Sequence, residues 1–451
     1  MLLLTRVQRF CTSSSRLPRA VKRHGLAALT LLAGLGLCQV VFAQPVLTLK
    51  GAQRMAVERS ARLAAGDALI AASRDMAAAA GQRPDPVIKL GIDNLPADGV
   101  DRFSVARDFM TMRRIGVTQE FTRDEKRRFK SERYTRETEL AVTERSVSEA
   151  AIQRDAALTW LEQYYLERMR TVVIAQTDEA GLEIEAAEGA FRAGRGSQAE
   201  VLAARAARVA LHDRLSELER RIRSARAMLA RWVGEAADAP LAGDPDISVV
   251  RINTHALDRE LGKHPEIAVL GRQVAIAEAD ALLARANKQP DWSVELAYQQ
   301  RGPAYSNMIS VGVSIPLQWD QKNRQDRELA ARLALVERAK AQQEDGLRAH
   351  VAEVRTMLNE WENGLERLVR YDRDLLPLAA ERTQATLAAY RGGKSDLAAV
   401  LAARRNEIDV RVQRVQLEMD TARVWAQLNF LTPDGAHELR PDSGVPSKET
   451  K

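Results

Sequence analysis

The stretch AFRAGRGSQAEVLAAR, residues 190–205, lies within a proline-free segment that runs from residue 124 to residue 233. Residues 193–197, AGRGS, are its weak point as a helix, because each glycine costs about 1 kcal/mol in a helix interior. The residues on either side have helix-forming composition. We therefore predict two helices that form a hairpin with its tip at residues 192–198.

Both arms of this hairpin carry an apolar seam typical of coiled coils. The spacing alternates between fours and threes after the tip, at Leu211, Leu215, Leu218, Ile222, Ala225, Leu229 and Trp232. Before the tip, apolar residues recur at sevens with a single four, which describes a locally unwound supercoil. At about 1.5 Å per residue the first arm would be roughly 100 Å long. Such a hairpin must stand out from the part that anchors its open end.

The tip occurs twice. Residues 389–404, AYRGGKSDLAAVLAAR, match residues 190–205 at nine of sixteen positions, and residues 311–314 and 320–324 echo 115–118 and 124–128. We predict two similar halves, 44–233 and 256–431, joined by a Gly-, Pro- and Asp-rich linker at 234–255. The second tip lies at 391–397. A polar tail follows at 432–451.

The net charge of +6 comes from the N-terminal region. The first 43 residues contain six Lys or Arg and no acid, and they include an apolar run that ends at Val41-Phe42-Ala43. This pattern predicts a secretory signal peptide over residues 1–43 and therefore an exported protein. The alternative is a retained membrane anchor. Both cysteines, Cys11 and Cys38, lie in this segment. A second alternative to a plain cleaved signal peptide is that Cys38 is acylated.

Each half contains two segments with the alternation of amphipathic strands, within residues 87–121 and 292–318. We expect one face to contact lipid through Ile88, Leu90, Ile92, Val117, Trp292, Val294, Leu296, Val311, Val313 and Ile315. A soluble sheet with one buried face is the alternative. Four strands cannot close a membrane barrel, and lipid does not tolerate open sheet edges. Three chains together would supply twelve strands.

The doubled tip, the strand ending Ser314-Ile315-Pro316-Leu317 and the two-half layout together resemble the TolC-type outer membrane factors. The resemblance implies a mixed, mainly α fold and a homotrimer. A twelve-strand β-barrel in the lipid of the bacterial outer membrane would continue as an α-helical barrel into the periplasm. It also implies a passive efflux channel whose tip docks on a periplasmic adaptor and an inner-membrane pump, with no enzymatic activity, catalytic residues, cofactor or nucleic-acid partner.

Within this family, the chain is most similar to the branch that serves heavy-metal pumps. The similarity lies in residues 94–96, 108–112 and 316–320, together with Asn323 and Arg324. Export of heavy-metal cations is therefore the predicted function. Drug export or type I protein export through the same duct is one alternative. A periplasmic adaptor with a single helical hairpin is another.

The resemblance places the periplasmic aperture at the two tips, through Gly194, Gly196, Ser197, Glu200, Gly393, Lys394, Ser395 and Asp396. Relatives often carry acids beside the Val-Leu pair of the second tip, where this chain has Ala399 and Ala402. We therefore predict that Glu200 and Asp396 supply the aperture's charge.

The remaining candidate chemistry is weak. Gly393-Lys394-Ser395 lacks the first glycine and the preceding strand of a phosphate-binding loop. The histidines never pair at ligand spacing along the sequence, so no bound metal is expected.

Overall fold

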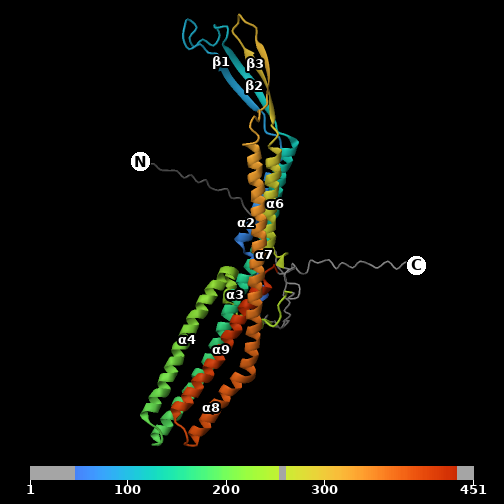
Figure 1. Cartoon of the computed structure of the whole chain (residues 1–451). Helices are drawn as coiled ribbons and strands as arrows, with labels where there is room; N and C mark the ends of the chain where they lie inside the picture. Colours follow the sequence, from blue (N-terminus) through green and yellow to red (C-terminus); the bar gives the residue numbers. More distant parts are fainter. Residues whose placement is uncertain (1–45, 253–260, 434–451) are drawn as a thin grey trace, which may run out of the picture. The chain divides into compact units, whose positions relative to one another are not determined.

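The computed structural model describes residues 46–252 and 261–433, which belong to a single compact unit (Figure 1). The predicted signal peptide lies outside these residues, as does most of the polar tail. The helices of the first half are α1 (Leu49–Glu58), α2 (Ala61–Ala80), α3 (Asp124–Arg192), α4 (Gln198–Val233) and the 3-10 turn η1 (Gly234–Asp238). Those of the second half are α6 (Pro265–Ala286), α7 (Gln325–Arg370), the π-helical turn η3 (Tyr371–Leu375), α8 (Leu376–Arg391) and α9 (Leu397–Asn429).

One four-stranded sheet lies at one end of the helices (Figure 1). Its strands are β1 (Val87–Asp93), β2 (Met112–Phe121), β3 (Trp292–Gln300) and β4 (Met308–Ser314), and they pair antiparallel in that order. The two strands of each half form a hairpin, and β2 and β3 join the halves. The predicted fold, in which each half supplies two strands and a long helical hairpin, is confirmed.

The long helices run away from the sheet and pack along one another (Figure 1). Helix α3 is unbroken over 69 residues and contacts α2, α4, α6 and α9. Toward the tips, α4 packs on α3, α3 on α9, and α9 on α8. The two predicted hairpins, α3–α4 and α8–α9, therefore lie side by side.

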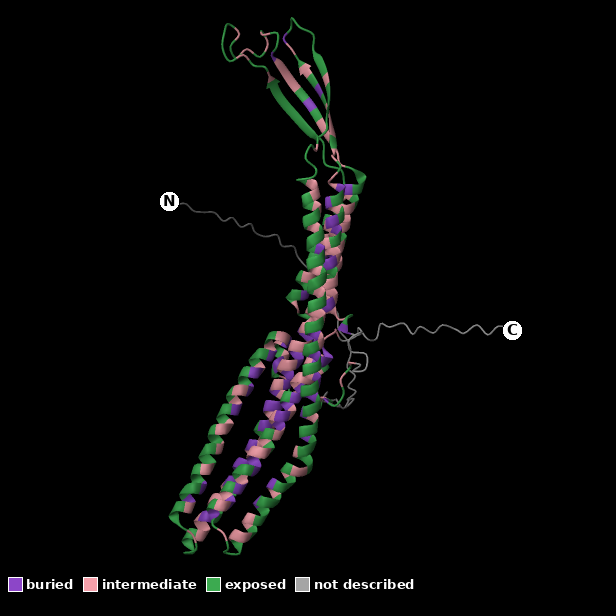
Figure 2. Ribbon diagram, viewed as in Figure 1, coloured by how far each residue is buried: buried purple, intermediate pink, exposed green. Residues whose placement is uncertain are grey.

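The buried core is concentrated along α3 and α9 midway down the helices, as the purple segments of Figure 2 show. Trp160, Tyr165, Leu229 and Met419 are among its fully buried side chains. No helix in the described ranges combines the length and the apolar character that crossing a membrane requires.

Three elements differ from the sequence prediction. The alanine-rich, proline-free stretch of residues 54–80 predicts one helix, but residues 49–80 form the two helices α1 and α2, because the Ser60 hydroxyl accepts a hydrogen bond from Leu63 N and starts a new helix. Strand β4 ends at Ser314 rather than near residue 317, since Pro316 has no N–H for a ladder. Pro377 predicts an interruption before the second tip, and a new helix, α8, does start there, directly after the π-helical turn η3.

Candidate functional site

The strand register aligns apolar residues into rows that cross all four strands. One row is Ile88, Val117, Leu296 and Val311, and the next is Leu90, Ile115, Tyr298 and Ile309. Alternation places both rows on the same face of the sheet. Leu90 and Val311 are 75% and 70% exposed. A contiguous apolar face of this kind marks an interaction surface.

Nine of the ten residues predicted to contact lipid lie on this face. Ile315, the tenth, follows the end of β4 and is also exposed. Of the ten, Val294 alone is half-buried. Near the helices the face ends in Phe121 stacked on Trp292, with ring centroids 4.4 Å apart. Which molecules cover the apolar face is a question of function.

The opposite face of the sheet is charged and internally paired. Lys89 Nζ lies 2.9 Å from a carboxylate oxygen of Glu295, and Arg114 forms ion pairs with both Glu295 and Asp93. These residues come from β1, β2 and β3. The sheet therefore separates a polar face from an apolar one, as the sequence alternation predicted.

Strands β1 and β4 are the two ends of the sheet, and each has a neighbouring strand on one side. Their outer edges are Val87–Asp93 and Met308–Ser314. Exposed strand edges present backbone N–H and C=O groups that pair readily with another strand. The sheet is therefore suited to extension by further strands at both ends.

The two hairpin tips have the same backbone geometry. Gly194 and Gly393 have φ of 68° and 67°, a conformation that glycine adopts at low cost. Arg195 N donates to Ala190 O at 2.9 Å, and Lys394 N donates to Ala389 O at 2.8 Å. Both copies of the repeated tip therefore form a Schellman turn. Gly194 and Gly393 thus occupy the one position of each turn that favours glycine, whereas Gly196 has no positive φ.

Glu200 and Asp396, the two predicted aperture acids, cap helices. Glu200 accepts a 2.7 Å hydrogen bond from Ser197 N, and the Ser197 hydroxyl accepts one from Glu200 N at 3.2 Å. Asp396 accepts a 2.9 Å bond from Ala399 N. Capping carboxylates stabilise the first turn of α4 and of α9. A role in the aperture's charge stays a prediction.

Exposed cations lie at equivalent positions of both tips, and Lys394 alone among them was predicted from the sequence. Arg192 and Arg195 at the first tip correspond to Arg391 and Lys394 at the second. The same repeat offset that revealed the tips would have found them. Besides the two predicted acids, Glu200 and Asp396, the tips therefore carry these four exposed basic side chains.

A small apolar cluster joins the two tips. Val201 of α4 and Val400 of α9 occupy equivalent repeat positions, and both are buried with Ala187, Ala204 and Leu397. The hairpins are therefore held together at their far ends and not at the level of the core alone.

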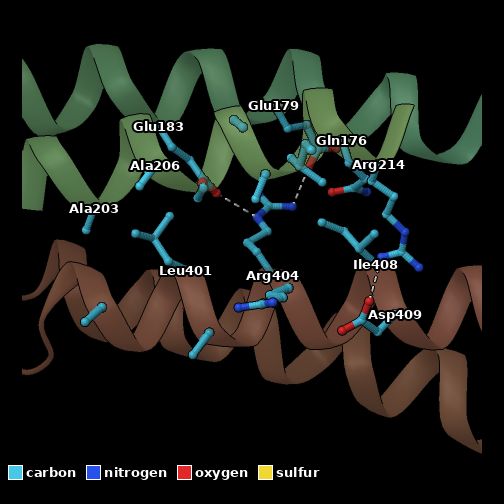
Figure 3. A pocket seen from close by; sticks show the side chains of 17 residues that line it. Gln176, Glu179, Glu183, Ala203, Ala206, Arg214, Leu401, Arg404, Ile408 and Asp409 are labelled. Atoms are coloured by element: carbon cyan, nitrogen blue, oxygen red, sulfur yellow. Dashed lines mark hydrogen bonds and ion pairs between the residues drawn. The ribbon is translucent and has the colours of Figure 1, made fainter. Parts of the chain in front are cut away.

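A groove of about 630 Å³ lies between α4 and α9, next to this cluster on the side away from the tips, and residues of α3 also line it (Figure 3). Its walls carry alanines, which leave the space open. Arg404 of α9 reaches across to Glu179 and Glu183 of α3, at 2.6 and 3.3 Å. Burial raises the pKa of Glu183, and the Arg404 charge opposes that shift. Arg214 and Asp409 link α4 to α9 at 2.7 Å.

Buried tryptophans fix the region where the halves begin. Trp160 Nε1 donates to Leu47 O at 3.0 Å, and Trp361 Nε1 donates to Ile247 O at 2.9 Å. Trp425 makes a third bond of this kind, to Val249 O. Composition gave no sign of these bonds, although Trp160 and Trp361 are related by nearly the repeat offset.

Two histidines that are far apart in the sequence lie close together in the structure. His264 and His350 are 86 positions apart, yet their ring nitrogens lie 3.1 Å from each other. In the ranges 46–252 and 261–433, no three His, Cys, Asp or Glu side chains are grouped so that they could hold a metal ion.

Comparison with known proteins supports the sequence interpretation. Residues 256–432 match the family described as outer membrane efflux protein. No curated protein matches the chain by sequence.

Three similar solved structures are the outer-membrane channel OprN, CusC and the outer membrane protein VceC of Vibrio cholerae. The TM-scores are 0.70, 0.73 and 0.70, at 18%, 14% and 18% identity. Each match covers 85% of this chain, and 90%, 92% and 95% of the respective structures. The second half of the chain is thus similar to the outer membrane efflux protein family, and the described chain as a whole has the predicted TolC-type fold.

Proposed function

We propose that three copies of this chain form an outer-membrane conduit, through which substrate delivered by an inner-membrane pump and a periplasmic adaptor leaves the cell. The observation that carries the proposal is the sheet, which has one exposed apolar face, one charged face and two available edges. Pairing β4 of one copy with β1 of the next would satisfy both edges in a twelve-strand barrel. The apolar face would then contact lipid and the charged face would line the lumen.

The helical hairpins supply the second part of the conduit. Three copies would place six hairpins around the barrel axis, with α4 at one margin and α8 at the other margin of each copy's helical layer. The tips would meet the adaptor, and Arg192, Arg195, Arg391 and Lys394 would present positive charge to it. Because the substrate crosses such a conduit passively, the chain needs no catalytic centre.

For the cargo we propose heavy-metal cations, on the resemblance of residues 316–320 and 108–112 to that branch of the family. Similarity to the solved channel structures, at 14% and 18% identity, concerns the fold and does not identify the cargo. Drugs or proteins exported by another pump are the alternatives. The pump that delivers the substrate would largely decide among them.

Deletion of the gene in its native host tests the function directly. We expect a cation-sensitive strain, with tolerance to Cu, Zn, Co or Cd restored by the wild-type chain. Unchanged cation tolerance with loss of drug or protein export would replace the proposed cargo and keep the conduit. Recovery of the protein in the soluble periplasmic fraction would contradict the conduit itself.

A further inference from the structure

The apolar face of the sheet continues beyond the end of β4. Ile315, Leu317 and Trp319 keep the alternate spacing of the apolar residues of β4, and they are 55%, 65% and 88% exposed. Continued past Ser314, the β3–β4 register sets Ile315 opposite Trp292, the first residue of β3. Leu317 and Trp319 therefore lie beyond the margin of the paired strands, on the side where the helices begin.

Side-chain amides fix the segment that carries Trp319. Gln318 Nε2 donates to Asn287 O at 3.1 Å, and Gln321 Nε2 donates to Lys288 O at 2.7 Å, just past the end of α6. Trp319 lies between these two attached residues and is still exposed. The indole therefore adds to the apolar face at a fixed place, and a contiguous apolar surface of this kind marks a contact with a partner.

Two basic residues follow the indole closely. Lys322 and Arg324 are exposed, and neither forms an ion pair within the described ranges. The nearest acids along the chain have other contacts, since Asp320 accepts a hydrogen bond within its own turn and Asp326 pairs with Lys288 at 2.7 Å. The surface beside the indole therefore offers two free positive charges.

This order of chemistry matches the edge of a membrane. The apolar band of a membrane barrel is about 25 Å tall and has aromatic girdles at both interfaces. Trp favours that level because its ring is apolar and its N–H is polar. Lys and Arg just outside the band attract anionic headgroups. Apolar strand residues, then an indole, then two bases follow one another here along the chain, which favours lipid as the partner of this surface.

We propose that Trp319, Lys322 and Arg324 bind anionic phospholipid headgroups in the periplasmic leaflet of the outer membrane. The indole lies at the level of the lipid glycerol groups, and the two bases hold the phosphate. This contact sets the depth of the sheet in the membrane and fixes the point at which α7 leaves it. The inference rests on the proposed function, because it requires the apolar face of the sheet to contact lipid.

Native mass spectrometry of the full-length protein in detergent tests the site. Phosphatidylglycerol, which is anionic, and phosphatidylcholine, which is zwitterionic, are added separately, and the lipids retained per chain are counted. We expect wild type to retain phosphatidylglycerol in preference. Lys322→Gln/Arg324→Gln should weaken phosphatidylglycerol binding by about 30-fold, because each base near an anionic surface contributes about fivefold. Trp319→Gln should weaken the retention of both lipids.

Arg338→Gln/Lys340→Gln is the matched control. It removes the same charge from exposed positions of α7 that lie roughly 20 Å farther along the helix, and it should keep wild-type lipid binding. Equal phosphatidylglycerol retention in wild type and Lys322→Gln/Arg324→Gln would overturn the inference. So would dissociation of the assembly by Trp319→Gln with unchanged lipid retention, since the segment would then contact a second copy of the chain.

Membrane fractionation separates this inference from the proposed function. Wild type in the outer-membrane fraction, without a preference for phosphatidylglycerol, would contradict the lipid site alone. Wild type in the soluble periplasmic fraction would contradict the conduit and the lipid site together. If the double variant does not assemble, Lys322→Gln alone is measured, and its phosphatidylglycerol binding should be weaker than that of wild type by about fivefold.

Discussion

Trp160 donates its indole N–H to the backbone carbonyl of Leu47, 3.0 Å away, and so attaches the segment before α1 to the middle of α3. Trp361 and Ile247 repeat the arrangement in the second half, at 2.9 Å. Both indoles are buried, at 1% and 9% exposure. The start of the first half and the linker before the second half are therefore each hydrogen-bonded to a long helix of the half that follows.

Loss of one such bond should destabilise the protein. Trp160→Phe removes the donor and keeps most of the ring, and we expect a cost of about 1 kcal/mol with a lower Tm. The carbonyl of Leu47 keeps a second donor, Ala242 N at 3.2 Å, which limits the loss. Trp319→Phe, at a site 88% exposed, is the control and should leave Tm unchanged. Equal Tm values for the two variants would show that the buried bond contributes nothing.

The tip glycines should resist substitution. Gly194→Ala forces a side chain into a left-handed conformation, at a cost of about 1–2 kcal/mol. Gly181→Ala is the matched control, because Gly181 lies within α3 and an added Cβ meets nothing within 4 Å. That change should stabilise the helix, by up to about 1 kcal/mol. Thermal unfolding should move in opposite directions in the two variants, and a shift of the same sign in both would contradict the role given to the turn.

The Arg404 contact predicts a pH-dependent effect. Burial raises the pKa of Glu183, so the folded chain binds a proton more readily than the unfolded chain does. Stability from this group therefore falls as pH rises above about 4.5, and Arg404 limits the fall. Arg404→Met removes the opposing charge, and its loss of stability should be larger at pH 8 than at pH 5.

Arg220→Met serves as the control for this pH series, since Arg220 pairs with Glu217 on an exposed helix surface. Its unfolding profile should follow that of wild type at every pH. If Arg404→Met loses the same stability at pH 5 and pH 8, Glu183 is not the group that Arg404 compensates.

The two faces of the sheet should differ sharply in their tolerance of charge. Val311→Lys places an ammonium group on the apolar face, which costs about 2–4 kcal/mol near the middle of a bilayer. Ser310→Lys places the same group one residue away on the opposite face. We expect the first variant to assemble poorly in the outer membrane and the second to assemble normally, as measured by membrane fractionation. Equal assembly of both would mean that the apolar face does not meet lipid.

Much of this architecture could be predicted because the repeat and the alternation of side chains are local in sequence. The tip at residues 192–198 was found from its glycines, and structure places Gly194 at a positive φ there. Strand faces followed from period-two spacing. The boundary at Ser60 was missed because an N-cap serine resembles any other polar residue until the next turn of helix is seen.

The missed contacts are long-range. His264 and His350 meet because α6 packs along α7, and no spacing rule relates positions 86 apart. The resemblance assigned Glu200 and Asp396 to the aperture, so their roles as helix caps were not predicted. Both acids stand three residues from a capping partner, so the capping motif was readable in the sequence.

The central claim is that one chain supplies part of a wall that only several copies can close. The native mass of the purified protein in detergent, compared with the mass of its single processed chain, tests it most directly. We expect a particle of three chains, with a disulfide forming between cysteines introduced on β1 of one copy and β4 of another. A monomer at all protein concentrations, with no cross-link for any β1–β4 cysteine pair, would contradict the account.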